Sequence, residues 1–228
     1  MLRWGLPTNR PKSSGASAAL QVGAATAARG FTGRAPIAAM AAPTKPPAFY
    51  NGPMTTLTFR NATLDDIEAI TALVTSAYRG QASRAGWTTE ADLLDGQRID
   101  PDVLAGDLSR ADSRVLLAYR DDELVACAHV AREGDAGYFG MFSVRPTLQG
   151  AGIGKDVMVE AERIAHKELG VEVMRMTVID VRESLIAFYE RRGYVRTGTF
   201  KPFPYGDARF GTPLRDDLRF EVLEKSLV

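Results

Sequence analysis

The segment YFGMFSVRPTLQGAGIGK at residues 138–155 constrains the fold of this chain more than any other. An apolar, β-prone run is followed by a proline, a glycine-rich turn and the start of a helical pattern, which predicts a strand, a loop and a helix in succession. Gly150, Gly152 and Gly154 let the backbone approach a ligand and expose its N–H groups. The helix N-terminus adds unpaired donors and a partial positive charge of about half a unit. The segment therefore predicts a cradle for a pyrophosphate group.

Two common phosphate-binding patterns do not fit this cradle. A Walker loop needs glycine at the position of Gln149, and it needs Ser or Thr where Asp156 follows Lys155. A dinucleotide fingerprint that starts at Gly150 needs glycine at the position of Lys155. The pattern that remains is Q-x-x-G-x-G, which begins at Gln149. Lys155 opposes the dipole of the predicted helix, and a bound anion would relieve that conflict.

The rest of the chain predicts an α/β (α+β) fold with a sheet of mixed strand direction. Thr63 and Asp66 form a capping-box pattern ahead of a helix. Thr89 and Asp92 form a similar pair, and Pro101 is typical of a helix start, so residues 86–108 predict two short helices. The expected order is β-α-α-β-β-β-α-β-α-β-β. The first strand is expected at Leu57 and Phe59, and the others at 115–119, 124–130, 138–144, 171–179, 194–200 and 218–227. The later helices are expected at 154–168 and 183–192.

Residues 1–53 differ in composition from the predicted domain, residues 54–228. They are rich in Ala, Gly, Ser, Thr and Pro, and the chain has no Asp or Glu before Asp65. We interpret them as a disordered segment that acts as an organellar transit peptide, with RGFT at 29–32 resembling a mitochondrial cleavage site. The expected location is the mitochondrion. The alternatives are a plastid, or the cytoplasm if translation starts at Met40 or Met54.

Charge and composition disfavour several classes of function. The chain has 28 basic and 28 acidic residues, but seven of the basic ones precede Asp65, so the remainder carries a formal −7. This acidic body argues against nucleic-acid binding, which needs a basic face. No apolar run is long enough to cross a bilayer, so we expect no membrane association. Cys127 is the only cysteine, and with just two histidines we expect no metal site.

Two motifs in order resemble the GNAT superfamily of acyl-CoA N-acyltransferases. The pyrophosphate loop of that family reads (Arg/Gln)-x-x-Gly-x-(Gly/Ala) between a strand and a helix, as FSVRPTLQGAGIGKDVM does here. About 30 residues later, ESLIAFYERRGYVRTG resembles the second signature of the family, a helix that carries a tyrosine and ends at Gly-Tyr. The resemblance covers roughly residues 55–227. It implies a centrally splayed sheet, acetyl-CoA as co-substrate and an amine as acceptor, and relatives frequently form homodimers.

The resemblance also implies roles for individual residues. CoA would be held by the loop and by the strand before it, and a backbone N–H near Val144 would polarise the thioester carbonyl. Tyr189 matches the tyrosine that protonates the departing thiolate, whereas Arg182 stands where relatives often have Asn. The CoA-binding residues implied are Phe142, Ser143, Val144, Gln149, Gly150, Ala151, Gly152, Ile153, Gly154, Lys155, Arg182 and Tyr189.

The base and the acceptor pocket are less constrained. His129, Glu133, Glu90 or a water chain could take the proton of the amine, although His129 could equally be a core residue. We expect Tyr78, Trp87, Glu90 and Arg98 in the acceptor wall. The predicted activity is acetyl transfer to a primary amine of a small molecule or peptide by direct attack in a ternary complex. The alternative is a non-catalytic module that binds CoA or acyl-CoA.

Overall fold

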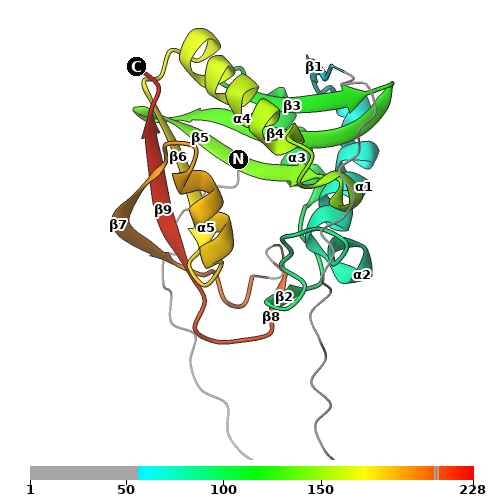
Figure 1. Cartoon of the computed structure of the whole chain (residues 1–228), viewed down its shortest axis with the longest axis vertical. Coiled ribbons are helices and arrows are strands. Elements are labelled where there is room, and N and C mark those ends of the chain that lie inside the picture. The colour runs from blue at the N-terminus through cyan, green and yellow to red at the C-terminus, as the bar shows by residue number, and fades with distance from the viewer. Residues whose placement is uncertain (1–55, 208, 210) are drawn as a thin grey trace, which may run out of the picture. The chain divides into compact units, whose positions relative to one another are not determined.

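The computed structural model describes residues 56–207, 209 and 211–228, so the predicted transit peptide lies outside the described residues. Figure 1 shows a central sheet with helices packed against it. The strands are β1 Thr58–Asn61, β2 Leu94–Asp95, β3 Ser113–Arg120, β4 Glu123–Glu133, β5 Ala136–Val144, β6 Val173–Ile179, β7 Val195–Pro202, β8 Thr212–Pro213 and β9 Arg219–Ser226. The helices are α1 Ile67–Tyr78, α2 Gly80–Ser83, α3 Pro101–Ser109, α4 Ile153–Arg163 and α5 Glu183–Glu190, with a π-helical turn at Ile164–Glu168.

The main sheet has seven strands in the order β1-β3-β4-β5-β6-β9-β7. All neighbouring pairs are antiparallel except β5 and β6. These two pair only at Gly137 with Met174 and at Tyr138 with Arg175, so beyond Tyr138 the sheet splays open. The splay exposes one backbone edge of the second half of β5, which is the part that leads into the glycine-rich loop. The predicted mixed, centrally splayed sheet is confirmed.

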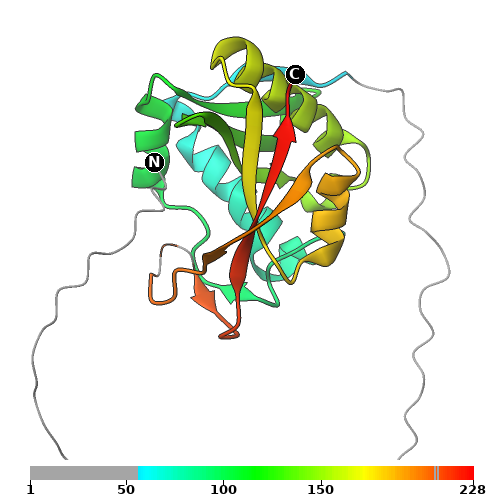
Figure 2. The same ribbon diagram turned by 90° about the vertical axis from the view of Figure 1, so that its left-hand side faces the viewer.

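Helices cover both faces of the sheet (Figure 2). α4 and α5 bury Val157, Met158 and Ile186 against one face, and α1 and α3 bury Ile70 and Leu104 against the other. Apolar residues at helical spacing in α1 and α4 account for this arrangement, because each helix has a single face to bury. The splay is thus flanked on one side by β5, which leads into α4, and on the other by β6, which leads into α5.

A β-bulge bends β5 just before its end. The pairing of β4 with β5 shifts between Cys127 and His129, which oppose Ser143 and Gly140, so β5 contains one extra residue there. Met141 lies in the bulge with a φ of 48°, a left-handed conformation that is uncommon for a side chain of this size. Bulges of this kind redirect side chains and often occur beside active sites. The bulge lies directly before the last three residues of β5, which belong to the part of the strand beside the splay.

The prediction for residues 86–108 was partly wrong. Pro101 does begin a helix, α3, and Asp100 caps it by accepting bonds from the N–H groups of Asp102 and Val103. The first helix of the expected pair is absent: residues 87–93 form a turn that leads to the short strand β2, which pairs with β8.

The reason lies in tertiary contacts of the expected cap residues. Thr89 Oγ1 accepts from the N–H of Ala91 at 3.0 Å and also pairs with the hydroxyl of Ser83 at 2.6 Å, whereas the carboxylate of Asp92, which would complete the cap, binds Arg84 at 2.6 Å. Neither side chain caps a helix, and Leu94 of β2 is buried in a cluster with Phe203.

Candidate active site

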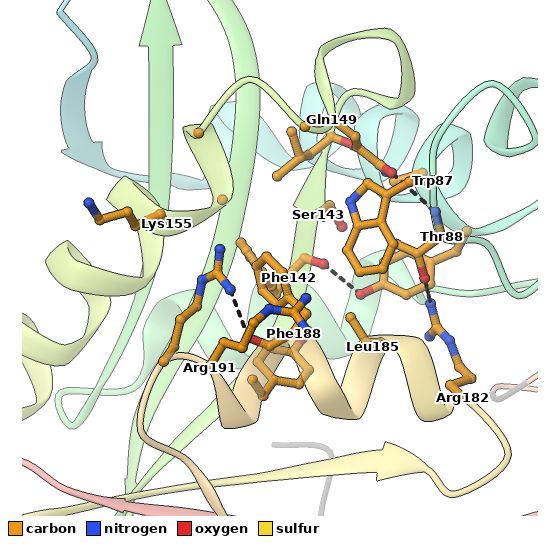
Figure 3. A pocket seen from close by; sticks show the side chains of 18 residues that line it. Trp87, Thr88, Phe142, Ser143, Gln149, Lys155, Arg182, Leu185, Phe188 and Arg191 are labelled. Atoms are coloured by element: carbon orange, nitrogen blue, oxygen red, sulfur yellow. Dashed lines mark hydrogen bonds between the residues drawn. The ribbon is translucent and has the colours of Figure 1, made fainter. Parts of the chain in front are cut away.

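A cleft of about 400 Å³ lies at the splay between β5 and α5. Its lining comes from four segments: the end of α1, the turn at Trp87 and Thr88, the end of β5 with the loop that leads into α4, and helix α5 with the residues that flank it. Figure 3 shows the side chains of Trp87, Gln149 and Phe188 around this cleft. The rings of Trp87 and Phe188 are 5.5 Å apart, so the turn and α5 meet across it. The cleft therefore brings together the two sequence motifs and a turn that neither motif includes.

The glycine-rich loop has the backbone that the sequence predicts. Gly150 and Gly152 have φ values of 86° and 88°, which residues with side chains rarely adopt. Gly152 is the N-cap of α4 and supplies no side-chain cap, so the first N–H groups of the helix stay open. A Cβ at Gly154 would lie 3.2 Å from the ring of Phe142, so only glycine fits there without displacement. Gly150 and Gly152 are therefore required by their backbone conformation, and Gly154 by its close contact with Phe142.

Fewer backbone N–H groups of this loop are open to a ligand than the sequence predicted. The N–H of Gln149 bonds the carbonyl of Pro146 at 3.3 Å, and that of Lys155 bonds the carbonyl of Gly152 at 2.9 Å. Among the described residues, no acceptor is recorded for the N–H groups of residues 150–154. Five consecutive open donors at a helix N-terminus form a nest that can bind a diphosphate.

Gln149 acts through its side chain. Its amide nitrogen donates to the carbonyl of Val144 at 3.3 Å, and its amide oxygen accepts a long bond from the N–H of Thr88 at 3.4 Å. A Cβ at Gly86 would come within 2.4 Å of the same oxygen, so the turn and the loop lie in close contact. Gln149 thus ties the loop to the strand before it and to the turn across the cleft.

Cationic side chains stand where the cleft opens. Lys155 is exposed and extends from α4 away from Trp87 and Phe188 (Figure 3). Arg191 and Arg192 also line the cleft, and Arg192 donates to the carbonyl of Phe188 at 2.7 Å while its guanidinium lies 3.4 Å from the centre of that ring. Partial burial lowers the pKa of Arg192. The two arginines stand in the second motif but were not predicted as site residues.

Tyr189 lies on α5 in the wall of the cleft. Only 6% of the residue is exposed, and its ring packs edge-on against Phe188 and Tyr194. No hydrogen bond to its hydroxyl is recorded among the described residues. Burial raises the pKa of Tyr189 well above the ordinary value for a phenol. The side chain is therefore a protonated donor at the cleft.

The end of β5 lies opposite Tyr189. Phe142, Ser143 and Val144 all line the cleft, and they belong to the edge of β5 that the splay leaves unpaired. The carbonyl of Phe142 accepts a 2.6 Å hydrogen bond from the hydroxyl of Tyr78, which comes from the end of α1. Tyr78 was predicted in the acceptor wall, and it lines this cleft and holds the strand segment in place.

Arg182 lines the cleft at its inner edge. Its guanidinium donates to the hydroxyl of Thr88 at 2.7 Å (Figure 3). It also donates to the carboxylate of Glu90 at 2.7 Å. Glu90 is buried and also binds Arg79 at 2.8 Å and Arg98 at 3.6 Å. Burial alone would raise the pKa of Glu90, but the three guanidinium groups outweigh it and lower that pKa. Glu90 and Arg98 lie behind the cleft wall and not in the lining.

His129 lies outside the residues that line the cleft. It is on β4, on the sheet face covered by α1 and α3, and 4% of it is exposed. Its Nε2 is 2.8 Å from the hydroxyl of Ser113, and its Nδ1 is 3.7 Å from Asp107. Burial lowers the pKa of His129 to about 4, although Asp107 opposes the change. The ring is thus a neutral member of a buried polar group.

Comparison with known proteins places the chain in one family. Residues 68–194, more than half of the chain, match the acetyltransferase (GNAT) family. No curated protein matches it significantly. Among the described residues, no helix is long and apolar enough to span a membrane, and no three His, Cys, Asp or Glu side chains are placed to hold a metal ion together.

Solved structures resemble the fold at low sequence identity. The ribosomal-protein-S18-alanine N-acetyltransferase of Escherichia coli is 14% identical, with a TM-score of 0.55 and coverage of 75% of this chain and 94% of that one. An N-acetyltransferase from Staphylococcus aureus is 12% identical, with a TM-score of 0.57 and coverages of 75% and 98%. An N-acetyltransferase from Thermoplasma acidophilum, solved with coenzyme A, is 17% identical, with a TM-score of 0.54 and coverages of 75% and 99%. These similarities establish the fold.

Proposed function

Because the chain belongs to the GNAT family of acetyltransferases, we propose that it transfers an acetyl group from acetyl-CoA to a primary amine of a small molecule or peptide. One observation carries this proposal: the three glycines of the loop with the open donors, the unpaired edge of β5 and the phenol of Tyr189 line a single cleft. The loop can bind the diphosphate, the edge of β5 can donate to the thioester carbonyl, and the phenol can protonate the leaving thiolate.

The diphosphate of CoA is held by the loop in this proposal. The N–H groups of residues 150–154 and the helix dipole of α4 supply partial positive charge. Lys155, Arg191 and Arg192 add full charges where the cleft opens. The pantetheine arm then follows the exposed edge of β5 past Phe142 toward Tyr189. Trp87 and Phe188 cover this path.

Acetyl transfer proceeds by direct attack of the amine nitrogen on the thioester carbonyl. The C–N bond forms, and negative charge develops on the carbonyl oxygen, where an N–H of the segment Phe142–Val144 stabilises it. The C–S bond then breaks, and the sulfur takes the proton of Tyr189, whose raised pKa keeps it protonated at neutral pH. None of the candidate bases His129, Glu133 and Glu90 lines the cleft, so we propose that a water chain removes the proton of the amine.

Thiol release from acetyl-CoA in the presence of a panel of amines tests this function. We expect turnover with the wild type, and we expect Tyr189→Phe to lower kcat by about a hundredfold or more, as the loss of a general acid does. The affinity for CoA should change little, because the phenyl ring still packs in the wall. If no amine gives turnover while CoA still raises the melting temperature, the chain is a CoA-binding sensor and the proposal of catalysis is refuted.

We also propose that residues 1–53 direct the chain to the mitochondrion. Support comes from their composition: scattered arginines, many small residues and no acidic ones. Sequencing the N-terminus of the mature protein from cells tests this. A start shortly after residue 29 would support import and cleavage, whereas a start at Met1 would refute processing.

A further inference from the structure

The splay leaves the second half of β5 with one free backbone edge, and the alternation of strand pairing shows which groups lie on it. The N–H of Arg145 bonds the carbonyl of Val125 on β4 at 2.8 Å. In an antiparallel pair, successive residues point their backbone groups to alternate sides, so the N–H and the carbonyl of Val144 point away from β4. Because β6 pairs with β5 only further back along the strand, these groups face the open side of the splay, and Val144 lines the cleft.

Two side chains from other segments bind the carbonyl groups of this edge. The hydroxyl of Tyr78 donates to the carbonyl of Phe142 at 2.6 Å, and the side-chain amide of Gln149 donates to the carbonyl of Val144 at 3.3 Å. The N–H of Val144 lies between these two carbonyls along the edge, and no strand in the described part of the chain pairs with it there. It is thus a donor that this edge offers to a thioester carbonyl.

Packing on two sides holds Tyr78 in place. It is the last residue of α1, and its ring packs against the apolar cluster that α1 and α3 form with the sheet. The guanidinium of Arg98 lies over the ring, 4.4 Å from its centre. Burial raises the pKa of Tyr78, so the phenol stays protonated at neutral pH and donates to Phe142. Because this bond occupies its proton, Tyr78 is not a second acid beside Tyr189.

The backbone that Tyr78 binds lies directly after the bulge of β5. The register of β4 with β5 is interrupted at Met141 and Phe142 and resumes at Ser143. The carbonyl of Phe142 therefore lies where neither β4 nor β6 holds the strand, and the bond from Tyr78 supplies a restraint there. The same bond covers the negative end of that carbonyl, which would otherwise repel the charge that develops on the thioester oxygen.

We propose that Tyr78 is a positioning residue for acetyl transfer, and that its bond to the carbonyl of Phe142 holds the N–H of Val144 in line with the thioester oxygen. This inference rests on the proposed function, in which a donor on this edge stabilises the negative charge of that oxygen. Tyr78 acts through the strand and not on the reacting atoms. Removal of its hydroxyl should therefore slow the reaction without weakening the binding of acetyl-CoA.

Tyr78→Phe in the full chain removes the hydroxyl and keeps the ring. We expect kcat to fall by about ten- to a hundredfold, because misplacement of a catalytic group by about 1 Å can cost a hundredfold, while KM for acetyl-CoA changes less than about twofold. Loss of one hydrogen bond should lower Tm by only roughly 1–6 °C. Tyr119→Phe is the matched control, because the hydroxyl of Tyr119 accepts a bond of the same length, 2.6 Å, from Arg60 and lies outside the lining of the cleft. It should leave kcat unchanged.

The infrared band of the bound thioester carbonyl reports on the donor directly. Acetyl-CoA that carries carbon-13 at this carbonyl is added to the full chain without an amine, and a hydrogen bond to the carbonyl lowers its stretching frequency. We expect a shift to lower frequency in the wild type and in Tyr119→Phe, and a smaller shift in Tyr78→Phe. A residue that only supports the fold would change Tm and leave this band where it is in the wild type.

The outcomes separate this inference from the proposed function. An unchanged kcat in Tyr78→Phe, or a lower kcat with the carbonyl band of the wild type, would overturn the inference and leave acetyl transfer intact. A rise in KM for acetyl-CoA at constant kcat would also overturn it, because Tyr78 would then contribute to binding alone. If the wild type acetylates no amine, the proposed function is refuted, whereas the carbonyl band still shows whether Tyr78 positions the donor.

Discussion

Replacement of Glu90 by glutamine should destabilise the domain strongly. Glutamine keeps the shape of the side chain but removes a buried negative charge that pairs with the guanidinium groups of Arg79, Arg98 and Arg182. Two of those contacts are short and buried. Breaking a buried ion pair by removing one partner costs about 3–5 kcal/mol, because the other charge remains in the interior. For a domain of this size, roughly 2–4 °C of melting temperature is lost per kcal/mol, so Tm should fall by roughly 6–20 °C.

The assay is thermal unfolding of Glu90→Gln beside a surface control. Asp92→Asn breaks the exposed pair between Asp92 and Arg84 two residues away and should cost less than about 1 kcal/mol. Both variants are measured at neutral pH, where the lowered pKa of Glu90 keeps the wild-type carboxylate ionised. A Tm for Glu90→Gln within about 2 °C of that for Asp92→Asn would show that the three guanidinium groups do not need the carboxylate of Glu90, and it would refute the reasoning.

Two further predictions concern buried groups on β4. Cys127 should not react with a thiol reagent in the native protein, because burial raises its pKa to about 12, and it should react on denaturation; rapid labelling of the native state would contradict this. Because of His129, the free energy of unfolding should fall as the pH decreases from about 6.5 toward 4. In that range the ring of the unfolded chain takes up a proton, whereas the buried ring of the folded chain, with its pKa lowered to about 4, does not. Once the pH is below about 4, the total loss in the free energy of unfolding is about 3 kcal/mol. Denaturant unfolding should show a flatter pH dependence for His129→Gln, and identical profiles would refute the assignment.

Local patterns in the sequence were sufficient to predict most of the helices and strands of the fold. The periodicity of α1, α4 and the strands β3 to β6 predicts these elements, because each has a regular apolar face to bury. The strands β2 and β8 were missed, since a two-residue pair formed between residues 94–95 and 212–213 has no periodic signal. Thr89 and Asp92 suggested a helix cap, but contacts with Ser83 and Arg84 engage both side chains.

The candidate site likewise has one part that a local sequence pattern predicts and another part that only the folded chain brings together. The glycine-rich loop is contiguous in the sequence, so its backbone geometry and open donors could be predicted. The buried contacts of Glu90 with Arg79, Arg98 and Arg182 join separate segments, and only the folded chain brings these residues together. Arg182 was expected to touch CoA, and the structure shows its guanidinium bonded to Thr88 and Glu90.

Calorimetric titration of the purified chain with CoA tests the central claim, that the loop at residues 150–154 binds a diphosphate. Gly152→Ala and Gly134→Ala are compared, because both glycines have positive φ and open space around them, but Gly134 lies in the turn between β4 and β5. Both changes should cost about 1 kcal/mol of stability. We predict that the wild type and Gly134→Ala bind CoA equally and that Gly152→Ala binds at least tenfold more weakly. No detectable binding by the wild type, or equal binding by all three, would contradict the account.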